Sequence, residues 1–374
     1  MKVIVIGLGA MGSSVLYNLS KRGVEVIGID RFSPPHQFGS THGDTRVFRV
    51  AYKEGIDYVP LLIRAKELWY ELSQERESDI FLNTGVLYIA NHENDSVVGP
   101  LEVTKSYDID YEQLSHEELV YRYPALRPDQ DMVGFFDKEG GILKVEDCVE
   151  SYLGFSRNFG AKLILDEIVL NWKASNNGIE VITESDRFFA DKLIVSAGAW
   201  LTDLIDLNPV NLSIERQVNH WIDVKDKTQF SISELPVTTW EYGLENRSFY
   251  TIPDLGQGFK ISRHHGGEIT NPNDVDRSVK NSEVEDIQQL FESFFEASGV
   301  VENSKTCLYT NTDSQDFLID FYEGNDNVLI LSPCSGHGFK FASVVGEIAA
   351  DLIETGKSKF NLTNFSFKKH KNFN

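Results

Sequence analysis

Apolar and polar positions at the start of the chain follow a strand–helix–strand order. The β-branched run Lys2–Ile6 predicts a buried parallel strand, because strands covered on both faces are continuously apolar. Apolar residues at helical spacing predict a helix over Ser13–Arg22, and Val24–Ile29 predicts a second strand. This order is typical of a doubly wound α/β sheet.

The same alternation returns later in the chain. A hairpin is predicted from Leu163–Leu170 and Ile179–Thr183, around the turn sequence Asn176–Gly178. Helices are predicted over Asp57–Gln74, Val145–Phe159 and Ala342–Thr355, and strands over Gly85–Ala90, Lys192–Val195 and Asn327–Leu331.

Between about residues 210 and 310 this rhythm is lost, and alternating strands carry many aromatic residues. That pattern predicts an antiparallel sheet with a binding face. A strand, a glycine turn and a helix return near the C-terminus, so we expect a discontinuous Rossmann-type α/β domain. Its pieces are residues 1–84, 145–210 and 311–374. Residues 85–144 and 211–310 are expected to form an inserted substrate domain on a mixed or antiparallel sheet with helices.

A glycine-rich turn follows directly on the first predicted strand. Gly7 makes the tight turn, Gly9 lets a pyrophosphate approach the backbone, and Gly12 lets the helix pack closely on the strand. The helix N-terminus carries a partial positive charge that favours phosphates. Asp30 ends the second strand, where a carboxylate accepts hydrogen bonds from a ribose hydroxyl. Together these features predict a site for an adenine dinucleotide.

Two further strands end in turns of small residues. Lys192–Val195 is followed by Ser196–Trp200, where small side chains allow a cofactor to approach closely. Asn327–Leu331 leads to Ser335–Lys340, a second glycine turn before a helix. We therefore expect a cofactor to border Gly198, Gly336 and Gly338.

Composition narrows the classes of partner. The net charge of −22 argues against nucleic acid and anionic membranes, because phosphate neutralisation needs a basic surface. A carboxylate substrate would need a local cationic pocket. Three scattered cysteines predict neither a disulfide framework nor a metal site. Glycines interrupt the apolar start too early for a signal peptide, and no run reaches the ~18 residues of a membrane span. We expect a cytoplasmic protein.

Three motifs carry a specific resemblance: Gly39–Tyr52 (GSTHGDTRVFRVAY), Cys307–Thr310 (CLYT) and Ser335–Ala342 (SGHGFKFA). They are similar to motifs of the monomeric sarcosine oxidase and N-methyl-L-tryptophan oxidase family of FAD-dependent amine oxidases. The similarity runs from Val3 through the C-terminal helix. It implies FAD held by an 8α-S-cysteinyl link, and oxidation of a small secondary amine by O2. It also implies a monomer.

The resemblance assigns contacts to the flavin. Cys307 matches the cysteine that carries the flavin, although a free cysteine is more often a small core residue. Cys334 has no counterpart in the family, and we expect its side chain to pack in the protein interior. His42 and Thr45 match residues that line the cofactor. The family usually has His-His where this chain has Thr41-His42.

The resemblance also assigns the substrate clamp. Arg49 and Lys340 match the two cations that hold the substrate carboxylate. An anion in a closed pocket needs charge-assisted donors, and a guanidinium offers two in a fork. Both cations stand in glycine-flanked, otherwise apolar segments, where an unused charge would be costly.

Four residues match catalytic positions. Arg46 matches an arginine close to the flavin ring, and Lys260 matches the lysine that promotes reduction of oxygen. A cation is suited to that step, because oxygen takes up negative charge. Tyr250 and His264 match further active-site residues. The Tyr250–Lys260 spacing is one residue shorter than usual, and a surface position is the other interpretation of His264.

The implied reaction is oxidative demethylation of an N-methyl amino acid, of sarcosine or N-methyl-L-tryptophan type, to the primary amino acid, formaldehyde and H2O2. Three alternatives stay open: a glycine- or D-amino-acid-type flavin oxidase without the covalent link, an NAD-dependent dehydrogenase, and a non-catalytic flavin-binding module. Arg49 and Lys340 count against the last, which needs no carboxylate clamp. In the segment 236–250, Trp240 and Tyr242 are candidates to narrow the side-chain pocket or to stack on an indole.

Overall fold

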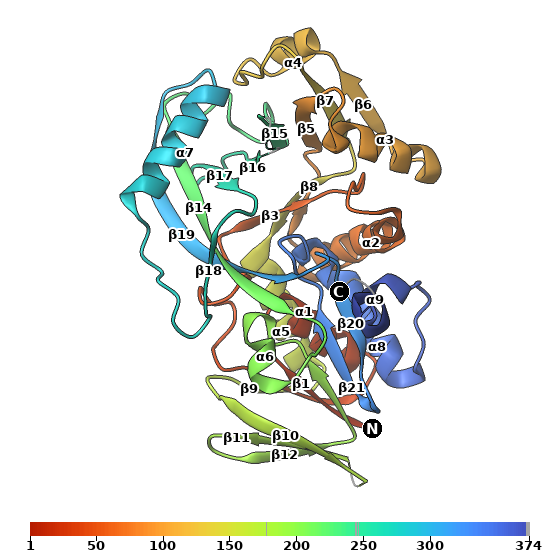
Figure 1. Cartoon of the computed structure of the whole chain (residues 1–374). Coiled ribbons are helices and arrows are strands. Elements are labelled where there is room, and N and C mark those ends of the chain that lie inside the picture. Colours follow the sequence, from red (N-terminus) through yellow and green to blue (C-terminus); the bar gives the residue numbers. More distant parts are fainter. Residues whose placement is uncertain (177, 244, 246, 372–374) are drawn as a thin grey trace.

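A six-stranded sheet forms the lower half of the computed structural model, which describes residues 1–176, 178–243, 245 and 247–371 (Figure 1). All neighbouring strands are parallel except the edge pair β20–β21. The strands come from three distant segments, as expected for a discontinuous Rossmann-type sheet. In spatial order they are β20 (Leu318–Tyr322), β21 (Asn325–Ser332), β13 (Lys192–Val195), β1 (Lys2–Ile6), β2 (Glu25–Ile29) and β9 (Lys162–Ile164).

Both faces of this sheet are covered, which explains its apolar strands. Val3 and Val5 of β1 face a layer of helices, whereas Ile4 and Ile6 face a small antiparallel sheet. The helices are α1 (Ala10–Lys21), α2 (Val59–Arg76), α5 (Val145–Asn158) and α8 (Ala342–Thr355), and the small sheet is β10 (Val169–Ser175), β11 (Gly178–Thr183) and β12 (Arg187–Ala190).

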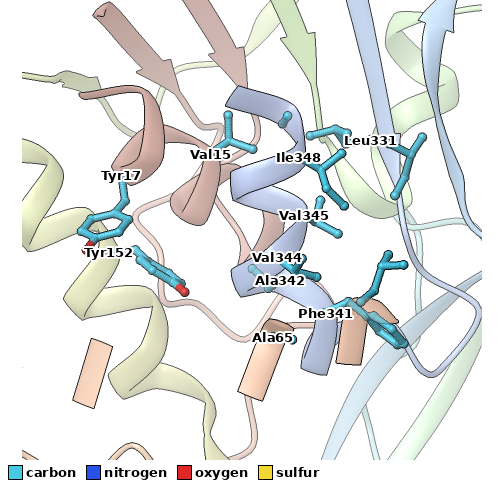
Figure 2. Close-up of a cluster of buried hydrophobic side chains, with 14 of the residues drawn as sticks. Val15, Tyr17, Ala65, Tyr152, Leu331, Phe341, Ala342, Val344, Val345 and Ile348 are labelled. Carbon is cyan, nitrogen blue, oxygen red and sulfur yellow. The ribbon is translucent and has the colours of Figure 1, made fainter. Parts of the chain in front are cut away.

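The helices of that layer pack directly on one another. Figure 2 shows Val15 of α1, Ala65 of α2 and Val345 of α8 within one cluster of buried side chains. Each carries its apolar residues at helical spacing, so a single stripe of each helix is buried. This layer fixes the start of α1 above the sheet.

The predicted hairpin is only partly correct. Its first strand begins at Val169 rather than Leu163, because Leu163 pairs with Gly28 of β2 and completes the parallel sheet. The apolar run therefore divides between two sheets. Asn177 of the predicted turn lies outside the described residues.

A nine-stranded mixed sheet forms the upper half (Figure 1). Its neighbours are antiparallel except for β5 and β15. In order they are β18 (Glu268–Ile269), β14 (Leu212–Val224), β17 (Phe259–Arg263), β16 (Arg247–Ile252), β15 (Val237–Tyr242), β5 (Val86–Asn91), β7 (Met132–Asp137) and β6 (Tyr111–Leu114), with β19 (Gly299–Thr312) also paired to β14.

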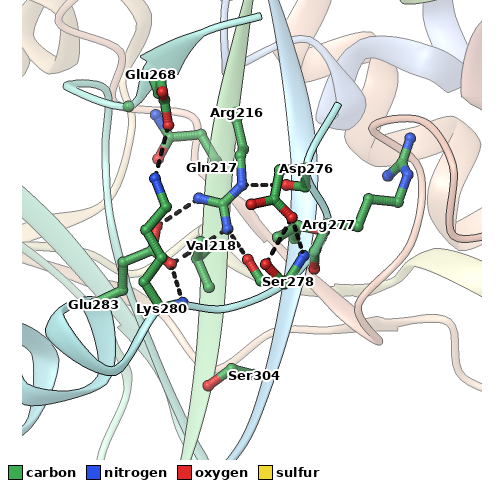
Figure 3. Close-up of polar contacts among 12 residues, drawn as sticks. Arg216, Gln217, Val218, Glu268, Asp276, Arg277, Ser278, Lys280, Glu283 and Ser304 are labelled. Carbon is green, nitrogen blue, oxygen red and sulfur yellow. Dashed lines mark hydrogen bonds and ion pairs between the residues drawn. The ribbon is translucent and has the colours of Figure 1, made fainter. Parts of the chain in front are cut away.

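A helix packs on this sheet within the range 210–310, where the sequence pattern predicted alternating strands. It is α7 (Asn281–Phe294), and its buried Ile287, Leu290 and Phe291 stand at helical spacing. The buried Arg216 of β14 binds Glu283 in the first turn of α7, and it donates to the carbonyls of Asp276 and Ser278 in the segment before the helix (Figure 3).

Short elements complete the fold. The helices α3 and α4 lie at the outer end of the upper half, and a three-stranded sheet lies between the two halves (Figure 1). The division of the chain into two domains at the boundaries given above remains our proposal. The remaining elements are α3 (Asp95–Tyr107), α4 (His116–Arg122), α6 (Leu201–Leu204), α9 (Phe367–Lys371), β3 (Thr45–Phe48), β4 (Phe81–Leu82) and β8 (Gly141–Lys144).

Within the described part of the chain, none of the helices combines the length and apolar character needed to cross a bilayer. The same residues hold no group of three or more side chains suited to binding a metal ion.

Candidate active site

A cavity of about 500 Å³ runs from the parallel sheet to the mixed sheet. Its size is that of a site for a small organic ligand. At one end it meets the glycine turn before α1, and at the other it meets β15 and β16. Eleven of the predicted site residues line it: Gly7, Gly9, Asp30, Arg46, Arg49, Gly198, Tyr250, His264, Gly336, Gly338 and Lys340.

The glycine turn is shaped for close approach. A Cβ on Gly12 would lie 1.7 Å from the carbonyl oxygen of Gly7, so only glycine lets α1 begin there. Gly9 stands at the N-cap of α1 without a side-chain cap, and Gly9, Ala10 and Met11 at this helix start line the cavity. A 12-residue helix that starts in this way fits the diphosphate of a dinucleotide.

Asp30 stabilises the same turn as well as lining the cavity. Its carboxylate accepts hydrogen bonds from the backbone N–H groups of Leu8 (2.6 Å) and Phe32 (2.8 Å). Burial raises its pKa to about 6 despite those bonds. A carboxylate has further lone pairs, so these bonds leave Asp30 able to accept from a ribose hydroxyl as well.

Five predicted residues are absent from the lining and lie buried behind it: Gly12, His42, Thr45, Lys260 and Cys307. Lys260 is 1% exposed, and its Nζ donates to the carbonyls of Gly43 (2.7 Å) and Thr45 (3.0 Å). Burial, followed by the charge of Arg46, holds the pKa of Lys260 well below its usual value.

The buried ring of His42 lacks hydrogen-bond partners among the described residues. Both ring nitrogens are buried and have no hydrogen bond to any described residue. Burial and then the charge of Arg46 lower its pKa to about 3, so the ring is neutral. Buried polar groups are normally paired, so these nitrogens fit a bound polar cofactor beside them.

The two thiols near the cavity differ. Cys307 is 3% exposed, and its Sγ lies 3.5 Å from Nδ2 of Asn219. The Oδ1 atom of Asn219 accepts from the Tyr250 hydroxyl at 2.9 Å, which joins the thiol to a cavity residue. Cys334 lines the cavity itself, and burial raises its pKa to about 11, which keeps it protonated. No motif in the sequence indicated a role for Asn219.

Arg49 and Lys340 meet in one cationic pocket, with an acid that sequence reasoning missed. Arg49 pairs with Glu54, and its guanidinium lies 4.8 Å from the centre of the Tyr52 ring. The Nζ of Lys340 lies 5.2 Å from the same ring centre and donates to the carbonyl of His337 at 2.6 Å. The only sequence signal for Glu54 was its place five residues after Arg49.

Glu54 offsets part of the positive charge of this pocket, and the neighbours of Glu54 and Lys340 shift the pKa values of both groups. Burial raises the pKa of Glu54, but Arg49 and its other cationic neighbours more than offset this and lower it. Burial, and then Arg49, lowers the pKa of Lys340 well below its usual value. An added carboxylate would favour the charged form of Lys340. Oε2 of Glu54 is buried without a hydrogen-bond partner among the described residues, so the pocket is not closed to further donors.

His264 lines the cavity, so the surface interpretation is wrong. Its Nδ1 lies 3.2 Å from the Tyr309 hydroxyl. Burial, and then His265, lowers the pKa of His264 well below its usual value, so the ring is neutral. Tyr250 also lines the cavity, and burial raises its pKa.

Trp240 is among the residues that line the cavity, but its ring packs on the opposite face of the strand from Thr239 and Glu241. The ring is 1% exposed, stacks on Phe249 with centres 5.4 Å apart, and packs against Phe294 of α7. Tyr242 packs on Phe294 in the same way. Side chains alternate along a strand, so these two rings share the face away from the cavity. Leu244 and Asn246 of the same segment lie outside the described residues.

A glycine turn at the carboxyl end of a parallel sheet shares one cavity with the Arg49–Lys340 pocket under a mixed sheet. The glycine turn is placed as in Rossmann-type proteins that bind a dinucleotide. The chain belongs to the FAD dependent oxidoreductase family, whose sequence model matches residues 2–352. The family confirms FAD, rather than NAD, as the cofactor, and the glycine turn and His42 fit it.

Named relatives cover almost the whole chain. Monomeric sarcosine oxidase from Bacillus sp. (strain B-0618) is 34% identical over 376 residues, which cover 98% of this chain and 95% of the relative. N-methyl-L-tryptophan oxidase from Escherichia coli (strain K12 / DH10B) is 33% identical over 374 residues, which cover 97% of each chain.

Solved structures agree on the fold. NikD, an unusual amino acid oxidase essential for nikkomycin biosynthesis, superposes with a TM-score of 0.85 at 19% identity over 97% of this chain and 96% of its own. L-proline dehydrogenase from P. horikoshii reaches the same TM-score of 0.85 at 20% identity, over 100% of this chain and 98% of its own.

Proposed function

We propose that this protein oxidises N-methyl amino acids with O2 and water, giving the primary amino acid, formaldehyde and H2O2. The observation that carries this proposal is the Arg49–Lys340 pocket, which opens on the same cavity as the glycine turn. The two groups of full-length relatives, sarcosine oxidases and N-methyl-L-tryptophan oxidases, support the substrate class. FAD, when bound, accepts a hydride equivalent from the N-methyl carbon and returns the electrons to oxygen.

The residues of this chain position the reactants. We infer that Arg49 and Lys340 hold the substrate carboxylate by charge-assisted hydrogen bonds. The neutral His264 and the Tyr250 hydroxyl border the same space and orient the amine. The amine must be unprotonated to react, so it releases its proton to water before its methyl group is oxidised. Water then hydrolyses the substrate iminium, and this releases formaldehyde.

We assign the remaining roles in the same proposal. Lys260 and Arg46 supply positive charge where oxygen is reduced, and His42 and Thr45 lie against the flavin. The protein acts as a monomer, as the name of the sarcosine oxidase relatives indicates for them. A cytoplasmic location agrees with its three cysteines, all of which are unpaired, as a reducing compartment would keep them.

A peroxide-release screen over N-methyl amino acids, with glycine and D-alanine as comparison substrates, tests the substrate class. We expect peroxide with the N-methyl substrates and little or none with the others. A glycine- or D-amino-acid-type oxidase would show the reverse order. That alternative has only fold-level support, because the glycine oxidase from Geobacillus kaustophilus is 16% identical.

We further propose that FAD is attached covalently through Cys307. The charges of Arg46 and Lys260 and the Asn219 amide act against the increase that burial causes in the pKa of the Cys307 thiol. Tryptic mass spectrometry is expected to find the flavin on the Cys307 peptide, and Cys307→Ser should release FAD on acid precipitation. The matched Cys334→Ser variant should keep its flavin in the pellet. An adduct on Cys334, or fully extractable FAD in the unmodified protein, contradicts this assignment.

A further inference from the structure

A polar cluster forms one side of the cavity, beside the carboxylate pocket. Lys53 pairs with Glu241 of β15 and donates to Oγ of Ser96 at 2.6 Å, and the Ser96 hydroxyl donates to the same Glu241 oxygen. All three residues line the cavity. Lys53 directly precedes Glu54 in the chain, so the cluster adjoins the site proposed for the substrate carboxylate.

The neighbouring strand positions on this side are also polar. Thr239 and Glu241 alternate with Trp240 along β15, and Ser248 of β16 pairs opposite Glu241. Thr239 and Ser248 line the cavity as well. We call Lys53, Ser96, Thr239, Glu241 and Ser248 the polar wall.

Three of the aromatic rings of these strands lie on the other face, whereas Tyr250, opposite Thr239, is on the cavity side. Trp240, Tyr242 and Phe249 pack with Phe294 of α7 in a separate core cluster. Trp240 and Phe249 border the cavity, but the three rings would have to exchange faces with the polar wall to point into it. A strand can do this only by a one-residue shift of register.

We propose that the polar wall selects the substrate side chain: the site takes N-methyl amino acids with no side chain or a short, uncharged, hydrogen-bonding one, and disfavours large apolar or aromatic ones. The inference rests on the proposed function. The Lys53 and Glu241 side chains line the cavity and are only 28% and 14% exposed. An apolar substrate group there would desolvate both charged groups without forming a hydrogen bond to either of them.

The wall also disfavours a charged side chain. Lys53 and Glu241 neutralise each other, and each shares the Ser96 hydroxyl. An acidic side chain would be repelled by Glu241, and a basic one by Lys53, unless the pair separated. Separating a partly buried pair leaves one charge without a partner, which is costly. Hydroxyl and amide groups can instead donate to Glu241 or accept from Lys53.

Substrate pairs of equal size isolate polarity from volume. We would measure kcat/KM by peroxide release for N-methyl-L-asparagine against N-methyl-L-leucine, and for N-methyl-L-serine against N-methyl-L-2-aminobutyrate, with sarcosine and N-methyl-L-tryptophan as the size extremes. The expected result is a preference of at least tenfold for the polar member of each pair, and for sarcosine over N-methyl-L-tryptophan.

A double variant links that preference to the wall. Lys53→Met with Glu241→Leu removes both charges at once, so neither is left unpaired. The asparagine-to-leucine ratio is expected to fall at least tenfold. Lys66→Met is the control, because Lys66 of α2 pairs with Glu139 at 3.1 Å outside the cavity, and it should leave the ratio unchanged.

The outcomes separate the two claims. Failure of every N-methyl substrate to yield formaldehyde overturns the proposed function together with the inference. Formaldehyde release with an apolar preference in the unmodified protein overturns only the inference, as does a ratio that the double variant leaves unchanged. If the double variant fails to fold, the ratios of the unmodified protein still decide.

Discussion

Lys260→Met is expected to slow the reaction of the reduced enzyme with oxygen by roughly 10²–10³-fold, the cost of removing one preorganised charge-stabilising group. Lys260 is buried under the Gly43–Thr45 segment, where its charge is poorly screened by water. Methionine keeps similar bulk but no charge. Stopped-flow mixing of the pre-reduced variant with oxygen measures this step. Anaerobic reduction by substrate should change much less, because carboxylate binding rests on Arg49 and Lys340.

The control for Lys260 is Lys305→Met. Both ammonium groups lie 5.2 Å from the centre of the Trp221 ring, but Lys305 is only half-buried. The control should react with oxygen at the unmodified rate, and Lys260→Arg should recover part of the loss. Because the pKa of Lys260 is lowered, the oxygen reaction should also slow as the pH rises towards the usual range of lysine. Unchanged reoxidation in Lys260→Met would leave Arg46 as the better candidate.

Removing the carboxylate clamp is expected to weaken anion binding by about 1.5–3 kcal/mol for each lost charge-assisted bond. Lys340→Met tests one cation. Arg49→Gln is best combined with Glu54→Gln, because Arg49→Gln alone leaves the buried Glu54 without its partner. Binding of propionate, which has a carboxylate but no oxidisable amine, can be followed through the visible spectrum of the holoenzyme.

A matched control and a pH series complete that test. Arg64→Gln removes a guanidinium that pairs with Glu347 outside the cavity, and it should bind propionate normally. The lowered pKa of Lys340 means that it loses its proton below the usual range of lysine, so binding should weaken as the pH rises. Lys340→Met should remove that part of the dependence. Normal affinity in either clamp variant excludes the altered cation from the clamp.

Local sequence was enough to predict the dinucleotide end of the site. Gly7, Gly9 and Gly12 act through backbone geometry and Asp30 through its carboxylate, but all four stand in one strand–helix–strand unit, so their spacing predicts their arrangement. The helix α7 carried a local signal too, in apolar residues at helical spacing, but the abundance of aromatic residues favoured strands. Short apolar runs are ambiguous in this way.

Long-range pairing was beyond local sequence. Lys53 and Glu241 meet across 188 positions of the chain. Glu54 lies only five residues after Arg49, but no motif marks the two as partners. Alternation along β15 predicts that Trp240 and Tyr242 share a face, but only the packing of α7 decides which face. The packing directs both rings towards α7 and leaves Glu241 towards the cavity.

The product balance with sarcosine tests the central claim most directly. The purified holoenzyme, mixed with sarcosine in air, should release one formaldehyde, one H2O2 and one glycine for each sarcosine consumed, without added nicotinamide cofactor. Formaldehyde distinguishes removal of the methyl group from oxidation at the α-carbon, which gives a 2-oxo acid instead. Peroxide with glyoxylate and no formaldehyde, or no oxidation of any N-methyl amino acid, would contradict the account.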